Sequence, residues 1–116
     1  MRRKKTYVEK RPWGMFEQFT LNEVSTVKIL TIKKKEHPSL QYHHRRSEFW
    51  RVLDGRLIVT IGKRKRRVKK GDEVFIPKKT LHTATALTRN AKVLEISYGE
   101  FDEKDIVRVQ DKYGRA

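Results

Sequence analysis

The sequence contains no cysteine, and this absence limits the chemistry open to the protein. Disulfides and thiolate metal sites are excluded, so any metal has to be bound by imidazole, carboxylate or amide groups. No apolar run approaches the roughly 20 residues that a membrane-spanning helix needs. The basic start, Met1–Lys5, is not followed by the apolar segment of a secretory signal. We therefore expect a soluble, cytoplasmic protein with no membrane partner.

Acidic residues are scarce relative to basic ones. The sequence has 29 Lys and Arg against 14 Asp and Glu, a net charge of +15, and such a charge attracts anions of every kind. The densest basic run, Lys63–Arg67, lies at a predicted turn and has no interleaved aromatic residues to stack nucleic-acid bases. We interpret this run as a solvated surface, with a polyanion site as the alternative. A small phosphorylated ligand is the expected partner, and nucleic acid is not.

The apolar segments predict strands. They are short, rich in β-branched residues and alternating rather than helically spaced. The predicted strands are Val27–Ile32, Phe49–Leu53, Arg56–Ile61, Glu73–Ile76 and Lys92–Tyr98. A chain of 116 residues has room for one core. We expect a single all-β domain over residues 1–116, a sandwich or barrel, in which residues 1–6 form a basic tail.

Glycines mark predicted turns between these strands. Asp54-Gly55 has the signature of a tight hairpin, because both residues tolerate positive φ. Further turns are predicted at Gly62-Lys63 and at Lys70–Asp72. Pro77 should end the strand before it, since proline cannot donate a ladder hydrogen bond. The acidic stretch Gly99–Asp105 is expected to open one short helix.

Four nitrogen and oxygen donors have a spacing that predicts a metal site. In an extended strand Gln41 and His43 project to one face, because the side-chain period is two, and Glu48 begins the next strand. His82 follows Pro77 in a separate segment, so the four donors converge only if the barrel closes. One amide, one carboxylate and two imidazoles suit a single zinc, iron, manganese or cobalt ion. Such a site can bind substrate oxygens and stabilise an alkoxide or enediolate.

The same segments resemble the two motifs of the cupin superfamily, at Gln41–Gly55 and Gly71–Ala86. Longer blocks look like type II mannose-6-phosphate isomerase. They are Arg11–Gly14, Ser39–Trp50, Gly99–Phe101, Asp105–Arg108 and Asp111–Arg115. The resemblance implies a cupin fold, a double-stranded β-helix of jelly-roll type.

The resemblance also implies an activity and a ligand set. Members of this family interconvert mannose 6-phosphate and fructose 6-phosphate with one divalent metal ion per chain, often zinc. The family's ligands map onto Gln41, His43, Glu48 and His82. The chain departs from the family pattern at Arg45 and Phe49, where histidine is usual, and in the second motif at Lys79 and Ala86.

The resemblance leaves the other site residues as candidates. Arg45 has the strand parity of Gln41 and His43, so it is expected beside the metal, either binding substrate or opposing the ion by charge. Candidates for substrate binding are Arg45, Arg46, Arg108 and Arg115, because guanidinium groups bind phosphate with two parallel hydrogen bonds. Candidates for proton transfer are Lys33, His44 and Glu100.

Alternatives to the isomerase remain open. A cupin that binds a sugar phosphate or nucleotide sugar without catalysis, and a cupin that isomerises or epimerises another sugar, would use the same barrel. A homodimer is expected, because an unpaired edge strand favours pairing with another chain.

Overall fold

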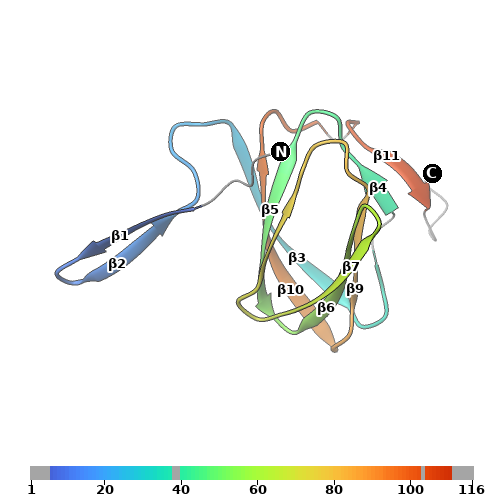
Figure 1. Ribbon diagram of the computed structural model, residues 1–116, viewed down its shortest axis with the longest axis horizontal. Coiled ribbons are helices and arrows are strands. Elements are labelled where there is room, and N and C mark those ends of the chain that lie inside the picture. Colours follow the sequence, from blue (N-terminus) through green and yellow to red (C-terminus); the bar gives the residue numbers. More distant parts are fainter. Residues whose placement is uncertain (1–5, 38–39, 103, 111–116) are drawn as a thin grey trace.

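The computed structural model describes residues 6–37, 40–102 and 104–110, and their regular elements are all strands (Figure 1). The strands are β1 (Tyr7–Arg11), β2 (Gly14–Gln18), β3 (Ser25–Lys33), β4 (Leu40–Tyr42), β5 (Ser47–Asp54), β6 (Arg56–Ile61), β7 (Arg64–Lys69), β8 (Glu73–Ile76), β9 (His82–Ala86), β10 (Asn90–Tyr98) and β11 (Val107–Gln110). In this part of the chain no helix is long and apolar enough to cross a membrane. The all-β prediction is confirmed.

Nine of these strands form two sheets that face each other. The four-stranded sheet has the order β3-β10-β5-β8, and the five-stranded sheet has the order β11-β4-β9-β6-β7. All strand pairs within them are antiparallel. The chain passes between the sheets several times, as from β5 to β6 and from β7 to β8, and so closes the two sheets into a barrel (Figure 1).

The core lies between the two sheets. Alternate residues of each strand point inward, as the period of two requires: Trp50, Val52 and Val93 come from the four-stranded sheet, and Leu57 and Val59 from the five-stranded sheet. All five side chains are buried. This apolar filling occupies the interior of the barrel beside the polar cluster described below.

A second, smaller apolar cluster lies on the outer face of the four-stranded sheet. Phe49, Ile96 and Tyr98 are buried there, and Phe19 from the segment after β2 packs against them. The rings of Phe19 and Phe49 are 5.7 Å apart. The middle strands of this sheet therefore bury apolar residues on both of its faces.

β1 and β2 form a separate hairpin, the arm, which extends away from the barrel (Figure 1). At its base Glu17 accepts two hydrogen bonds of 2.7 Å from Arg51 in β5, and one of 2.5 Å from Thr6. Trp13, at the tip, is 72% exposed. Indoles often pack in the core of a small protein. Trp50 does so here, but Trp13 does not.

Two local predictions are wrong. Asp54-Gly55 does not close a hairpin, because β5 and β6 belong to different sheets, and Gly55 (φ +80°) instead forms the corner between them. No residue described between Gly99 and Asp105 is helical. Asp105 uses its carboxylate to hold a loop, as shown below. The turn at Gly62-Lys63 is confirmed as the β6–β7 hairpin.

Candidate metal centre

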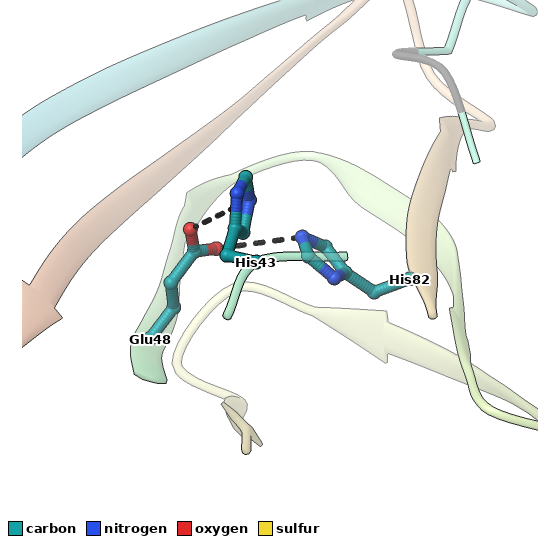
Figure 2. A group of neighbouring side chains, drawn as sticks. All are labelled: His43, Glu48 and His82. Atoms are coloured by element: carbon teal, nitrogen blue, oxygen red, sulfur yellow. Dashed lines mark ion pairs between the residues drawn. The ribbon is translucent and has the colours of Figure 1, made fainter. Parts of the chain in front are cut away.

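Three of the four predicted metal ligands meet inside the barrel (Figure 2). His43 follows β4, Glu48 lies near the start of β5, and His82 begins β9. Their exposed fractions are 3%, 2% and 2%, and one donor atom from each lies within 4.8 Å of the others. Two donors of a tetrahedral zinc site are about 3.4 Å apart, since each bond is about 2.0–2.2 Å long. Small side-chain rotations therefore bring the three onto one ion.

The orientation of the two imidazoles fits metal binding. The Nδ1 of His43 lies 2.7 Å from the carbonyl oxygen of Asp105, and the Nδ1 of His82 lies 3.0 Å from that of Thr80. A carbonyl only accepts, so each Nδ1 carries the proton and each neutral ring keeps a lone pair on Nε2. Both Nε2 atoms face Glu48, at 3.5 and 3.7 Å (Figure 2). Hydrogen bonds of this kind orient the imidazole ligands of known metal sites.

The protonation of His43 agrees with this role. Burial lowers the pKa of His43 below its ordinary value, an effect that the hydrogen bond to Asp105 and the charge of Glu48 only partly offset. His43 is therefore neutral at pH 7, which is the state that binds metal.

Asp105 holds the loop that carries His43. Its carboxylate accepts hydrogen bonds from the backbone N–H groups of His44 (2.9 Å) and Arg45 (3.0 Å), while its carbonyl accepts the His43 Nδ1–H. Burial by itself would raise the pKa of Asp105, but the two N–H donors and the positive charge of Arg45 bring it below its ordinary value. An ionised Asp105 thus fixes the segment between β4 and β5.

Gln41, the fourth predicted ligand, lies beside the cluster. In the five-stranded sheet Gln41 is directly opposite His82 of β9 on one side and Arg108 of β11 on the other. Directly opposed residues of antiparallel strands share a face, with Cβ atoms about 4.5–5.5 Å apart. Gln41 therefore lies between His82 and Arg108 in one row on the same face of the sheet. The Nε of Arg108 is buried and has no hydrogen-bond partner in the described part of the chain.

Arg46 is the predicted substrate-binding residue that lies closest to the donors. Its guanidinium donates to Nε2 of His43 (3.2 Å) and to Glu48 (3.4 Å), and it stacks on the ring of Phe101, 4.2 Å from the centroid. Arg46 is only 8% exposed. A buried cation thus already balances the charge of Glu48, which also accepts a hydrogen bond from Trp50 Nε1.

Sequence reasoning missed two further charged groups of the interior. Glu95 in β10 is 7% exposed, and burial followed by the neighbouring charge of Glu48 raises its pKa to about 7. Lys28 in β3 is opposite Glu95, and its Nζ lies 4.1 Å from the centroid of the Phe101 ring. A carboxyl with a near-neutral pKa can accept or release a proton at physiological pH. The alternation of β3 could have indicated that Lys28 points inward, because Lys28 and Leu30 are two residues apart and share a face.

The remaining candidates lie farther from the donors or outside the described residues. Lys33 is exposed at the far end of β3. The β3 residue in the same row as Glu48 is Thr26, which pairs with Ser97. Lys33 lies seven residues farther along β3, roughly 23 Å away at about 3.3 Å per residue. Lys33 therefore does not reach the cluster. His44, Arg45 and Glu100 are exposed. Arg45 lies outside the strands, so the parity that would have put it beside the metal does not apply. Arg115 lies outside the described residues.

Comparison with known proteins establishes the family. The family profile described as "Mannose-6-phosphate isomerase C-terminal" matches residues 2–111, nearly the whole sequence. The chain belongs to this family. Together with the barrel, the match confirms the predicted cupin fold and the resemblance on which it rested.

Curated relatives match this family member over only part of their own length. "Mannose-1-phosphate guanylyltransferase ManC" of Salmonella typhimurium is 34% identical over 110 residues, which cover 90% of this chain and 22% of the relative. "Xanthan biosynthesis protein XanB" of Xanthomonas campestris is 33% identical over 107 residues, which cover 90% of this chain and 23% of the relative. The chain therefore spans less than a quarter of these relatives.

Solved structures support the fold. The capsular polysaccharide assembling protein CapF of Staphylococcus aureus superposes with a TM-score of 0.70 at 16% identity, over 91% of this chain and 34% of CapF. KdgF from Halomonas sp. superposes with a TM-score of 0.67 at 21% identity, over 74% of this chain and 78% of KdgF. At these identities the likeness concerns the cupin fold alone.

Proposed function

We propose that this cupin is a metal-dependent aldose-ketose isomerase that interconverts mannose 6-phosphate and fructose 6-phosphate. The observation that carries the proposal is the buried set of His43, Glu48 and His82, in which both imidazoles direct an unprotonated Nε2 toward one carboxylate. The description of the family, a mannose-6-phosphate isomerase domain, supports the choice of reaction.

Gln41, His43, Glu48 and His82 would hold one divalent ion, zinc in the first instance or else manganese, iron or cobalt. When bound, such an ion supplies an electrophile for the oxygens at C1 and C2 of the sugar. His44 and Glu100 are the candidates that move the proton between these carbons, since Lys33 lies too far away. Asp105 keeps His43 in the orientation that binding requires.

Cationic side chains around the cluster would bind the phosphate. Arg46 and Lys28 lie on the same aromatic ring, that of Phe101, at 4.2 and 4.1 Å. Arg108, opposite Gln41, has a buried Nε–H that can donate a hydrogen bond to a phosphate oxygen. Guanidinium groups suit this role because their planar arrangement of donors matches the oxygens of a phosphate. Arg45, which is exposed, stays a candidate for phosphate contacts at the surface, and Arg115 stays a candidate from the sequence.

The test measures metal content and turnover in the same preparations. Protein purified without chelator is analysed for bound metal, and conversion of mannose 6-phosphate to fructose 6-phosphate is followed with and without added zinc, manganese and cobalt. We expect one ion per chain and metal-dependent turnover. His82→Ala should lower both metal affinity and kcat/KM by about 100-fold or more, because a direct ligand is lost.

His37→Ala is the matched control, since it removes an imidazole that is not part of the donor cluster. It should retain both metal and activity. Wild-type protein that binds its ion but converts no hexose phosphate would refute the isomerase and leave the metal centre standing. Equal metal content in His82→Ala and wild type would refute the ligand set itself.

A second candidate function is a cupin that binds a sugar phosphate or nucleotide sugar without catalysis. The contact of Arg46 with His43 and Glu48 favours it, because the guanidinium occupies the lone pairs that a metal would use. Under this alternative, the affinity for hexose phosphate, measured by calorimetry, is the same whether or not metal is added. A ligand affinity that rises with added metal would count against it.

A further inference from the structure

A hollow of about 180 Å³ lies over β6 and β7, on the outer face of the five-stranded sheet. Arg56 and Lys69 are directly opposite each other in the β6–β7 ladder, and they alternate with the buried Leu57 and Val68. Arg67 is two residues from Lys69 and projects to the same outer face, because the side-chain period is two. Arg56, Arg67 and Lys69 all line the hollow. Three cations therefore gather around one small space.

These three cations repel one another. Directly opposed residues of antiparallel strands have Cβ atoms about 4.5–5.5 Å apart, and like charges in such positions are destabilising. Within the part of the chain that the structure describes, none of the three side chains has an ion-pair or hydrogen-bond partner. The carboxylate of Asp72, also in the lining, accepts a hydrogen bond of 3.0 Å from the backbone N–H of Lys69. The cationic groups are therefore left for a partner outside the chain.

The charge and the size of the hollow indicate the class of ligand. Three cations and Asp72 leave a charge of +2 around it, and a phosphate monoester carries about −1.5 to −2 at pH 7. Guanidinium groups match the oxygens of phosphate with planar pairs of donors. The hollow is smaller than the roughly 300–1,000 Å³ of sites that enclose a whole organic ligand, so it suits a single phosphate group. Nucleic acid is disfavoured, because β6, β7 and β9 contain no Phe, Tyr or Trp to stack a base.

The hollow is separate from the candidate metal centre. Ile61, at the other end of β6 from Arg56, pairs with His82. Five residues of β6, roughly 16 Å at about 3.3 Å per residue, separate Ile61 from Arg56. His82 is buried inside the barrel, whereas Arg56 is exposed on its outside. A phosphate group in the hollow therefore does not contact the metal ligands.

We propose that Arg56, Arg67 and Lys69 form a second anion site, which binds the phosphate group of a small phosphorylated metabolite. The two guanidinium groups donate hydrogen bonds to the phosphate oxygens, and the ammonium of Lys69 neutralises the remaining charge. Leu87, half-buried in the same lining, contacts the carbon atoms next to the phosphate. Because the anion removes the repulsion between Arg56 and Lys69, its binding stabilises the folded protein. The site does not depend on the isomerase activity proposed above.

The test follows the backbone amides of the isotope-labelled full chain by NMR during a titration with inorganic phosphate at constant ionic strength. We expect saturable shifts that fit one dissociation constant at the amides of four lining residues, Arg56, Arg67, Lys69 and Leu87. Glycerol phosphate, a phosphate monoester, should shift the same amides. Shifts at His82 report on the metal centre and are fitted separately, so the failure of one site is distinguished from the failure of the other.

Arg67→Gln and Arg64→Gln are a matched pair of variants. Both residues are exposed on β7, but Arg64 is opposite Ile61 and lies outside the lining of the hollow. Arg67→Gln should weaken phosphate binding by about 10-fold or more, because charge-assisted hydrogen bonds are lost. Arg64→Gln should change the affinity by less than about 2-fold, since exposed charges about 10 Å apart are largely screened. Thermal unfolding checks that both variants fold.

Urea denaturation gives a second readout. Lys69→Gln removes the charge opposite Arg56, so it should raise the midpoint of urea unfolding without phosphate and lose most of the stabilisation that phosphate gives the wild type. Shifts that spread over the exposed Lys and Arg residues without saturation would overturn the proposal, since the net charge of +15 alone explains them. Equal losses of affinity in Arg67→Gln and Arg64→Gln would also overturn it. Binding of a single-stranded oligonucleotide without binding of inorganic phosphate would assign this face to nucleic acid instead.

Discussion

Glu17→Gln is expected to destabilise the protein in a strongly pH-dependent way. Glu17 accepts two hydrogen bonds of 2.7 Å from Arg51 and one from Thr6, and its side chain is 21% exposed. These contacts, with the Arg51 hydrogen bonds first, lower its pKa from 4.5 to about 2. A shift of that size corresponds to about 3 kcal/mol of unfolding free energy at about 1.36 kcal/mol per pH unit. Arg51 keeps Glu73 as a partner in the variant, so we expect a loss of about 2 kcal/mol.

The sign of the pH dependence follows from the direction of the shift. Because the pKa of Glu17 is lower in the folded protein, its contribution is complete above about pH 5 and disappears as the pH falls toward 2. Urea denaturation of wild type and Glu17→Gln at pH 6 and pH 2.5 measures the difference at each pH. The difference should be about 2 kcal/mol at pH 6 and well under 1 kcal/mol at pH 2.5.

Glu9→Gln serves as the matched control. Glu9 pairs with Arg11 on the exposed part of the arm, and exposed pairs contribute roughly 0–1 kcal/mol. Its effect should be small at both values of pH. A loss in Glu17→Gln that is the same at pH 6 and pH 2.5, or a loss at pH 6 no larger than that of Glu9→Gln, would refute the reasoning.

Two further substitutions test the corner and the loop that build the site. Gly55→Ala should lower the free energy of unfolding, measured by urea denaturation, by about 3 kcal/mol, because φ is +80° and a Cβ would lie 2.5 Å from Oγ1 of Thr88. Gly62→Ala should lower it by only about 1 kcal/mol, because φ is +59° there and a Cβ would meet open space. Equal losses would exclude the close contact as the cause. Asp105→Ala should weaken zinc binding by about 10-fold in competition with a chromophoric chelator, since the loop that orients His43 is released. Unchanged affinity would show that His43 needs no such support.

The sequence predicted the strands well because their signal is local. Alternation and β-branched residues identified the segments that became β3, β6, β8 and β10, and Pro77 follows β8 as expected. The hairpin at Asp54-Gly55 was wrong for a physical reason. A tight turn between two strands looks the same in sequence whether the strands pair with each other or join different sheets, and only their long-range partners decide.

The site was partly predictable for a similar reason. His43, Glu48 and His82 have spacings that a closed barrel brings together, so the cluster was expected before the structure was known. Lys28 and Glu95 were not, because single charged residues within apolar strands are usually placed in solvent. Their inward phase becomes decisive only when the register of β3 with β10 is known. Asp105 belongs to the stretch that was expected to open a helix, and its hydrogen bonds to His44 and Arg45 depend on a contact across some 60 residues of sequence.

The two sheets differ in what they present at one of their edges. β7 ends the five-stranded sheet with five exposed residues out of six, every one of them Lys or Arg. If β7 of a second copy paired with this edge, two rows of Lys and Arg would lie against each other, and their repulsion opposes such pairing. The four-stranded sheet has no such protection along β3. Because the β7 edge repels its own copies, sheet-to-sheet contact cannot propagate from one molecule to the next through β7.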